Sequence, residues 1–287
     1  MRTGHERLST DERRTLAPFG RRLARVAGVQ DHGAYRLLWA GDPGGPPDPR
    51  PGQFYMLAAA TGWGGGDDER PYLPRAFSHA RVALDREGAH HLGFLIEAVG
   101  PGTERLAGLE TGDELWLAGP FGSGFRAPRP ASDAGRAVLV AGGVGTAPIL
   151  ALSDELGRQA IVLLGFRSIG HAAAASLFDA RPRVATDDGS VGRQALVTDL
   201  LHEELDADAR TTVFACGPPP MLESVRALCA ARGIEAQLAL ESGMACGYGA
   251  CFGCAVPTRD GLVRLCLDGP VLEAGQLETA LFEGAVH

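Results

Sequence analysis

The sequence contains neither lysine nor asparagine, and all 27 basic residues among its 287 are arginine. The missing lysine excludes Schiff-base and pyridoxal-phosphate chemistry as well as a Walker A phosphate loop. The missing asparagine excludes N-glycosylation. Any phosphate group that the protein binds must therefore be held by arginine, hydroxyl groups or backbone N–H groups.

A long hydrophobic run is also missing. The longest apolar stretch, residues 137–152, is interrupted by glycines and is shorter than the ~20 residues that a membrane span needs. The charged segment 1–14 has no apolar segment behind it, so we expect no signal peptide, no membrane association and a cytoplasmic protein. In a reducing compartment the six cysteines are expected to be metal ligands or buried thiols rather than disulfides.

Basic charge and aromatic residues are scarce. The net charge is −8 and aromatic residues make up 6% of the chain, so nucleic-acid binding is not expected. The length and the hydrophobic content of 45% are sufficient for two domains with cores of their own.

The first half of the chain has the pattern of an all-β domain. Residues 1–17 are predicted to form a solvated tail, and short, partly alternating runs follow it. Strands are expected at 23–29, 35–39, 53–58, 76–84, 91–99 and 114–117. Pro/Gly-rich stretches at 41–52 and 61–70 are predicted to be surface loops. Evenly spaced strands with little helix predict an antiparallel barrel.

After a Pro/Ala/Ser-rich linker at 127–135, strands alternate with helices. Strands are expected at 137–141, 160–164, 183–186, 211–215 and 235–240, and helices at 147–156, 172–179, 194–204 and 219–232. This alternation predicts a doubly wound parallel sheet. A glycine- and cysteine-rich loop, a short hairpin and a helical stretch at 273–282 are expected after Glu241.

Four cysteines follow the spacing C-x4-C-x2-C-x11-C, at Cys246, Cys251, Cys254 and Cys266. The plant-type 2Fe–2S proteins have a C-x4-C-x2-C…C spacing, whereas zinc ribbons favour paired C-x2-C elements. The interleaved glycines allow the backbone to turn N–H groups onto the sulfurs. The spacing favours an iron–sulfur cluster over zinc or uncoordinated thiols. Cys229, on a helical pattern, is expected to be a buried thiol.

Two turns are candidates for nucleotide binding. A glycine turn with Gly142, Gly143, Gly145 and Thr146 stands between a predicted strand and helix, where a phosphate is favoured, although it lacks the full GxGxxG fingerprint. The segment Cys216–Gly217–Pro218 ends a later strand. Because ligands of open α/β sheets bind at the carboxyl ends of strands, both turns are expected at one edge.

In the predicted barrel, Arg75, Ala76, Phe77 and Ser78 place a cation, an aromatic ring and a hydroxyl on or beside one strand. Arginine binds pyrophosphate bidentately, serine donates to it, and phenylalanine packs on a flat ring. Gly102 and Thr103 open a predicted helix shortly afterwards. By themselves, these residue types on one strand are more typical of an ordinary barrel strand than of a binding site.

Taken together, these segments resemble the electron-transfer subunits of heteromeric dihydroorotate dehydrogenases, within the ferredoxin-reductase-like flavoproteins. The resemblance covers about residues 20–275. It is carried by LPRAFS, GTERLAGLETGDELWLAGPFGSGF, LVAGGVGTAPI, LLGFRS, ATDDGSVG, FACGPPPML, LESGMACGYGACFGC and CLDGPV. It implies an FAD-binding barrel at 18–128, an NAD-binding α/β domain at 135–240 and a 2Fe–2S domain at 241–287.

The resemblance also implies roles for single residues. The flavin motif R-P-x-S corresponds to residues 75–78, with Ala76 in place of proline. The strand beside the flavin corresponds to Leu95, Ile96 and Glu97, and the phosphate-binding turn to Gly102 and Thr103. The four cluster ligands correspond to Cys246, Cys251, Cys254 and Cys266, with a last spacing that is short for the family. Glu241, just before the cluster loop, is either a partner of the flavin or nicotinamide or a surface carboxylate.

The implied function is electron transfer in pyrimidine biosynthesis. In the family, a catalytic subunit oxidises dihydroorotate on FMN, electrons pass singly through the 2Fe–2S cluster, and FAD delivers a hydride to NAD+. The assembly expected is a heterotetramer with two copies of each subunit. Alternatives are an NAD(P)H:ferredoxin oxidoreductase or hydrogenase subunit and, in another class, a metal-stabilised redox sensor or interaction module. Whether Arg167 accepts a 2′-phosphate or stacks on adenine is open, and NAD is expected from the resemblance.

Overall fold

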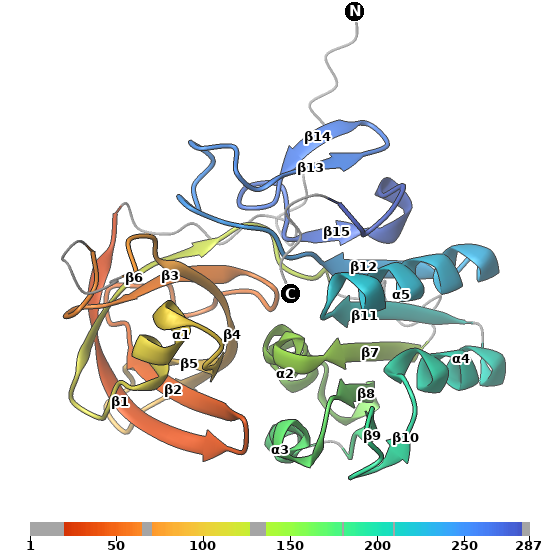
Figure 1. Cartoon of the computed structure of the whole chain (residues 1–287), viewed down its shortest axis with the longest axis horizontal. Coiled ribbons are helices and arrows are strands. Elements are labelled where there is room, and N and C mark those ends of the chain that lie inside the picture. The colour runs from red at the N-terminus through yellow and green to blue at the C-terminus, as the bar shows by residue number, and fades with distance from the viewer. Residues whose placement is uncertain (1–19, 65–70, 127–135, 180, 209, 283–287) are drawn as a thin grey trace, which may run out of the picture.

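The computed structural model describes residues 20–64, 71–126, 136–179, 181–208 and 210–282 (Figure 1). The predicted tail at 1–17, the linker at 127–135 and most of the predicted loop at 61–70 lie outside the described residues.

The first part is a closed six-stranded antiparallel barrel, as predicted. Its strands are β1 (Arg22–His32), β2 (Tyr35–Gly41), β3 (Phe54–Ala59), β4 (Arg75–Leu84), β5 (His90–Glu97) and β6 (Glu114–Phe121), in the order β1-β2-β5-β4-β3-β6. The barrel closes because β1 pairs with both β2 and β6. The short helix α1 (Pro101–Ala107) follows β5 and buries Leu106 in the barrel core. Gly102 and Thr103 open this helix, as expected.

The second part is a seven-stranded sheet with the order β10-β9-β8-β7-β11-β12-β15. Its strands are β7 (Arg136–Gly142), β8 (Ile161–Phe166), β9 (Arg183–Thr186), β10 (Arg193–Gln194), β11 (Thr211–Cys216), β12 (Glu235–Ala239) and β15 (Val271–Glu273). All neighbours pair in parallel except β15, which runs antiparallel on the edge beside β12. The predicted parallel sheet is confirmed, with one added antiparallel edge strand.

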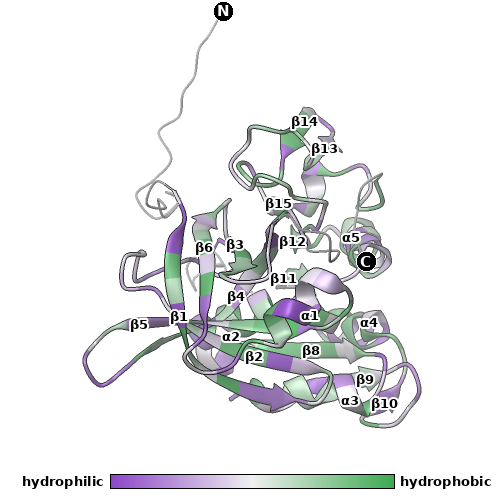
Figure 2. Ribbon diagram, turned by 60° about the vertical axis from the view of Figure 1, so that its left-hand side comes forward, coloured by the Kyte–Doolittle hydropathy of each residue, from purple (hydrophilic) through white to green (hydrophobic). Residues whose placement is uncertain are grey.

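Two cores lie on opposite faces of this sheet. Val138 and Val140 of β7 face one core, with α4 (Val197–Ala207) and α5 (Pro219–Arg232), and Leu139 and Ala141 face the other, with α2 (Thr146–Leu156). This alternation is the two-residue period of a strand buried on both faces. The second core continues into the barrel, so α2 lies between barrel and sheet (Figure 1). Figure 2 shows the hydrophobic colour along α2 and β8 in this region.

Three helix predictions need correction. The helical stretch expected at 273–282 is wrong, because its start pairs with β12 as β15 and only Ala274–Gln276 form a 3-10 turn. The helix expected at 194–204 begins at Val197, because Arg193–Gln194 pair with β9. The helix expected at 172–179 is replaced by α3 (Ile169–Ala172) and the 3-10 turn Ala173–Leu177.

The segment after β12 forms a cysteine-containing loop and a hairpin of β13 (Ala255–Thr258) and β14 (Gly261–Arg264) before it returns to the sheet as β15. Cys254 and Cys266 are buried in the core that also contains α5, so this part packs on the sheet. None of the helices in the described ranges is long and apolar enough to cross a membrane.

Candidate functional site

A cavity of about 160 Å³ lies where the three parts of the chain meet. The barrel contributes one wall, the turns after β7 and β11 a second, and the segment after β12 a third. The lining residues are Phe54, Ala76, Phe77, Ser78, Leu95, Val144, Ala147, Pro148, Cys216, Leu240, Glu241, Ser242, Met244 and Pro270. Predicted residues of the barrel motif therefore share this space with Leu95, Cys216 and Glu241. The glycine turn contributes Val144, whereas its predicted site residues lie outside the lining, namely Gly142, Gly143, Gly145 and Thr146.

Register places the barrel motif at this cavity. On β4, Phe77 pairs with Tyr55 and Ser78 with Phe54 of β3. Arg75 lies outside the lining; its Nη1 donates to the Leu73 carbonyl oxygen at 2.6 Å. A Cβ added at Gly102 would lie within 2.7–2.9 Å of the Arg75 guanidinium. The structure therefore brings the Arg75 side chain against the turn that opens α1, a contact that was not predicted from the sequence.

The Thr103 hydroxyl group is hydrogen-bonded within that turn. Its Oγ1 accepts hydrogen bonds from the N–H groups of Val99 and Gly100 at 2.9 and 3.0 Å. Ile96 is 1% exposed in the barrel core, so its side chain faces away from the cavity, whereas its neighbour Leu95 lines it. Glu97 also lies outside the lining and points to the α/β part.

The two nucleotide-type turns lie at one edge of the sheet, as predicted from their place at the carboxyl ends of β7 and β11, and the structure adds that they are in backbone contact. Ala141 and Cys216 are register partners at the ends of these strands. A Cβ added at Gly145 would lie 2.4 Å from the Cys216 carbonyl oxygen, and one added at Gly217 would lie 2.9 Å from the Gly142 nitrogen. Glycine is required at both positions because an added Cβ would come within 3.0 Å of backbone atoms of the other turn, which cannot move aside as a flexible side chain can.

The remaining members of these turns have distinct surroundings. A Cβ added at Gly142 would lie 3.0 Å from the ring of Pro218, so the second turn also packs on the first. Gly143 has a φ of 56°, the left-handed conformation that favours glycine. Thr146 is completely buried, and its Oγ1 has no hydrogen-bond partner among the described residues. An unpaired buried hydroxyl is costly unless a ligand or water satisfies it.

The cavity disfavours the ionised forms of its acidic groups, Glu241 and Cys216. Burial raises the pKa of Glu241 to about 7, and burial together with the Glu241 charge raises the pKa of the Cys216 thiol well above its usual value. Ser242 is buried, and its Oγ has no hydrogen-bond partner within the described ranges. Glu241 is thus a carboxyl group with a raised pKa in the lining of the cavity.

The cysteine loop begins two residues after the cavity-lining Met244. Gly247 and Gly249 have φ angles of 78° and 87°, and a Cβ at Gly247 would lie 2.6 Å from Met56 of β3, so the loop folds tightly against the barrel. Burial raises the pKa of Cys246, but hydrogen bonds to its sulfur, foremost from the Cys251 and Tyr248 backbone N–H groups, outweigh burial and lower the pKa to about 6. Backbone donors of this kind stabilise metal-bound thiolates.

The cysteines are close in pairs. The Cys246 sulfur interacts with Cys251, and the Cys266 sulfur with Cys254. Burial and the Cys254 thiol raise the pKa of Cys266 to about 12. In the described parts of the chain, no group of three or more His, Cys, Asp or Glu side chains has metal-binding geometry. The donor chemistry, four thiols with backbone N–H groups around them, fits an iron–sulfur cluster.

Several residues were not predicted as part of the site. Phe54, Leu240, Ser242, Met244 and Pro270 line the cavity. Ser242 and Met244 adjoin predicted residues and were within reach of sequence reasoning, because a hydroxyl next to Glu241 is a visible polar signal. Phe54 reaches the site only through barrel pairing.

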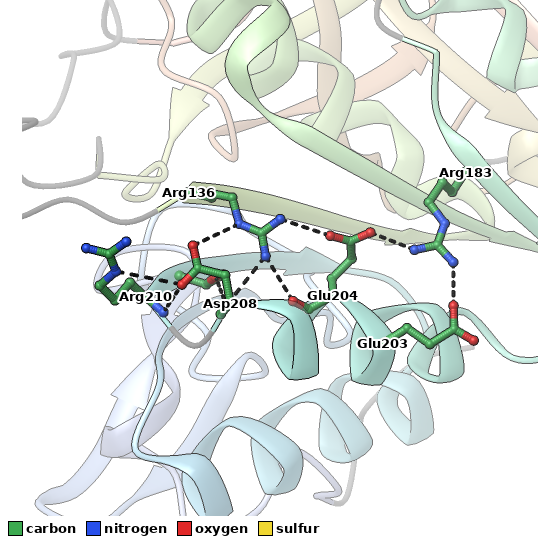
Figure 3. A network of polar contacts seen from close by, with 7 residues as sticks. Arg136, Arg183, Glu203, Glu204, Asp208 and Arg210 are labelled. Atoms are coloured by element: carbon green, nitrogen blue, oxygen red, sulfur yellow. Dashed lines mark hydrogen bonds and ion pairs between the residues drawn. The ribbon is translucent and has the colours of Figure 1, made fainter.

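A second hollow lies at the opposite edge of the sheet. It measures about 650 Å³ and is lined by Arg158, Ala160, Ile161, Val162, Asp179, Arg181, Arg183 and Glu204. Figure 3 shows that Glu204 bridges Arg136 and Arg183, at 3.1 and 2.6 Å, while Arg183 also pairs with Glu203. This hollow contains no predicted site residue.

Sequence comparison identifies relatives that match most of this chain. A dihydroorotate dehydrogenase B (NAD(+)) electron transfer subunit from Clostridium acetobutylicum is 33% identical over 231 residues, 79% of this chain and 86% of the relative. A probable subunit of the same name from Methanopyrus kandleri is 36% identical over 246 residues, 82% and 83% of the two chains. The chain belongs to the dihydroorotate dehydrogenase B electron transfer subunit family.

Two further comparisons concern the cluster segment and the fold. The sequence model described as the iron-sulfur cluster binding domain of dihydroorotate dehydrogenase B matches residues 241–278, which include all four predicted ligands. A chain of an NADH-dependent reduced ferredoxin-NADP oxidoreductase has a TM-score of 0.74 at 21% identity, covering 91% of this chain and 92% of that one. A ferredoxin NADP+ reductase from Neisseria gonorrhoeae, with FAD and NADP bound, has a TM-score of 0.52 at 18% identity, covering 74% and 92%. These structures share the fold.

Proposed function

We propose that this chain is the electron-transfer subunit of an NAD-dependent dihydroorotate dehydrogenase. It would accept electrons from a catalytic, FMN-containing subunit and pass them through a 2Fe–2S cluster and FAD to NAD+. The names of the family members support the reaction. Within this chain, the observation that carries the proposal is the shared cavity. Its lining includes Met244, and only one residue separates Met244 from the first proposed cluster ligand, Cys246, so the cavity and the cluster loop are adjacent.

The barrel side of the cavity fits a flavin. We assign the isoalloxazine ring to the space beside Ala76, Phe77, Ser78 and Leu95, where an apolar wall and one hydroxyl face the opening. Arg75, against Gly102, supplies the guanidinium for the pyrophosphate, which a lysine-free chain requires. Thr103 fixes the adjoining turn, and Ile96 and Glu97 would contribute backbone atoms of the neighbouring strand.

The opposite side fits a nicotinamide dinucleotide. The turn formed by Gly142, Gly143, Gly145 and Thr146 precedes an eleven-residue helix, and the unpaired Thr146 hydroxyl is available to a phosphate. Cys216, Gly217 and Pro218 stand between this turn and the barrel cavity, where the nicotinamide ring has to approach the flavin. We assign Glu241 to the contact between the two rings, since a carboxyl group with a pKa near 7 can donate or accept a hydrogen bond at physiological pH.

Cys246, Cys251, Cys254 and Cys266 are the proposed cluster ligands. When bound, a cluster supplies one-electron transfer and a flavin couples it to two-electron hydride transfer, so a chain that links FMN to NAD+ needs both groups. The loop holds Cys246 against β3 through Gly247, which keeps the ligand set next to the flavin wall. Cys251 is exposed, so the loop also faces outward, where a partner subunit has access.

The decisive experiment mixes the purified chain with the dihydroorotate dehydrogenase catalytic subunit of its own organism. We expect dihydroorotate-dependent reduction of NAD+ and a complex with two copies of each subunit. The isolated chain should show the absorption of an oxidised flavin together with that of an iron–sulfur cluster. A colourless, zinc-containing protein would contradict the proposal, and reduction of ferredoxin without any response to dihydroorotate would point to the ferredoxin-linked alternative.

A further inference from the structure

A polar cluster lies between the barrel and the α/β part, outside the cavity. Glu97, the last residue of β5, forms an ion pair with Arg167, which directly follows β8. The Glu97 Oε1 lies 3.3 Å from the Nε2 of His171 on α3, and Arg167 also contacts this ring nitrogen at 3.0 Å. The Oγ of Ser168 lies 3.1 Å from the other ring nitrogen.

The cluster stands where a dinucleotide's adenosine ribose is expected. In doubly wound sheets, the ribose meets the carboxyl end of the strand after the glycine turn, where an acidic residue binds the 2′-hydroxyl of NAD or an arginine accommodates the 2′-phosphate of NADP. β8 is that strand, since it neighbours β7 in parallel. The segment that directly follows β8, from Arg167 to Phe178, supplies an arginine and contains no acidic residue. The nearest acidic residues of the α/β part follow the next strand, β9, where the Asp187 N–H donates to the Phe166 carbonyl oxygen at 3.0 Å and Asp188 accepts from the Ser190 hydroxyl at 2.6 Å.

The carboxylate that contacts Arg167 comes from the barrel. The Glu97 side chain is 17% exposed, whereas that of Arg167 is 66% exposed, so the carboxylate is held by its surroundings and the guanidinium is open to solvent. Glu97 neutralises Arg167 and leaves carboxylate oxygen at the strand end. A 2′-phosphate bound to Arg167 would also lie next to the Glu97 carboxylate. The two negative charges would repel each other, which disfavours NADP.

Tyr35 provides an independent observation at the same place. It is opposite Glu97 in the register of β2 and β5, and its ring packs edge-on against His171 at 5.7 Å. Its hydroxyl is buried, has no hydrogen-bond partner among the described residues, and lies 3.8 Å from where a Cβ of Gly143 would stand. The Ala34 N–H donates to the Gly170 carbonyl oxygen at 2.8 Å and anchors the β1–β2 hairpin beside α3.

We infer that Glu97 is the specificity-determining residue that selects NAD over NADP, and that the Tyr35 hydroxyl binds the same nucleotide between its ribose and the glycine turn. This inference rests on the proposed function only in requiring a nicotinamide dinucleotide as the ligand. It assigns an acidic selectivity group to the flavin-type barrel, across a domain boundary from the nucleotide turn.

The test measures oxidation of NADH and NADPH by the flavin-loaded protein with ferricyanide as the electron acceptor, and competition by 5′-AMP and 2′,5′-ADP. In Glu97→Gln, the ratio of kcat/KM for NADH to kcat/KM for NADPH should fall at least tenfold, with tighter inhibition by 2′,5′-ADP. Adding Arg167→Ala to Glu97→Gln should abolish the gain with NADPH, because the freed guanidinium causes it. Tyr35→Phe should raise KM for both nucleotides about fivefold and leave the ratio unchanged.

A matched control separates selectivity from domain anchoring. Arg81 of β4 and Asp154 of α2 also form an ion pair between the barrel and the α/β part, at 2.6 Å. Asp154→Asn should leave the nucleotide ratio unchanged. An unchanged ratio in Glu97→Gln, or an equal loss with both nucleotides, would overturn the role of Glu97, and an unaffected KM in Tyr35→Phe would overturn that of Tyr35. A wild-type protein that oxidises neither nucleotide would instead refute the proposed function.

Discussion

Polar groups at the amino ends of the sheet's parallel strands, here called the amino edge, are paired differently from those at the carboxyl ends, here called the carboxyl edge. At the amino edge, Arg136, Arg183, Glu203 and Glu204 form a continuous series of ion pairs around the larger hollow (Figure 3). At the carboxyl edge, the smaller cavity has a carboxyl group with a raised pKa beside it, and the neighbouring Thr146 hydroxyl is buried without a partner in the described structure. Buried hydroxyl groups without a partner in the described structure, at Thr146 and Ser242, therefore distinguish the candidate site better than cavity volume does.

This difference implies a dissociation between stability and binding. Substitutions at the amino edge should lower the free energy of unfolding and leave nucleotide binding intact, because the paired charges there stabilise the fold. Removal of the unpaired polar groups at the carboxyl edge should weaken binding and leave the unliganded protein as stable as before, or more so. The following changes test that contrast, in order of decreasing expected effect.

Gly145→Ala should have the largest effect. The added Cβ would lie 2.4 Å from the Cys216 carbonyl oxygen and 2.7 Å from the Gly217 nitrogen, so the two turns must separate. We expect kcat/KM for NADH to fall about a thousandfold, or about 4 kcal/mol. Steady-state kinetics measures this, with Gly28→Ala as the control, since a Cβ at Gly28 meets nothing within 4 Å. Near-normal kinetics would show that the turns are not the binding site.

Glu241→Gln should change how stability depends on pH. Because the pKa of Glu241 is raised to about 7, the folded protein keeps a proton that the unfolded chain releases above its ordinary pKa of 4.5. The wild-type protein should therefore lose stability, relative to the variant, as pH rises from about 4.5 to 7, by about 3 kcal/mol in total. Chemical denaturation at a series of pH values measures the difference.

Glu203, at the amino edge, is a control for which stability should change with pH in the opposite direction. Hydrogen bonds from Arg193 and Arg183 hold the pKa of Glu203 below its usual value. Its contribution to stability is present above the unfolded pKa and is lost as pH falls, so Glu203→Gln should show the reverse dependence on pH. Equal slopes for the two variants would contradict the contrast between the edges.

Glu204→Ala should reduce the free energy of unfolding by about 2 kcal/mol, between the values typical of exposed and buried ion pairs. The Glu204 side chain is 15% exposed and is the shared partner of Arg136 and Arg183. Denaturant titration measures the loss, and the KM for NADH should stay within about twofold of wild type, well under 1.4 kcal/mol. A rise in KM with unchanged stability would contradict the assignment of this edge to structure.

Sequence alone predicted what is local. The glycine turn, the cysteine spacing and the barrel motif each follow from neighbouring residues. The meeting of the glycine turn with the Cys216–Pro218 turn at one edge followed from the rule for parallel strands, whereas the arrival of the barrel motif at the same cavity was not predicted. The pairing of Glu97 with Arg167 was beyond reach, because 70 positions separate them and the barrel brings them together. The stretch at 273–282 was misjudged for a similar reason: pairing of β15 with the exposed edge of β12 decides its start, and that pairing depends on tertiary structure.

Thr146→Val gives the smallest effect and the sharpest comparison. The valine has nearly the same shape and removes a buried hydroxyl that has no partner in the described structure, so the unliganded protein should be equally stable or more stable by up to about 1 kcal/mol. Nucleotide affinity should fall about tenfold, because the ligand loses one hydrogen bond. Thr211, at the amino end of β11, is the matched control, since its Oγ1 donates to the Asp208 carbonyl oxygen at 2.8 Å. Thr211→Val should lower stability and leave affinity unchanged, and the same outcome at both threonines would remove the distinction between the edges.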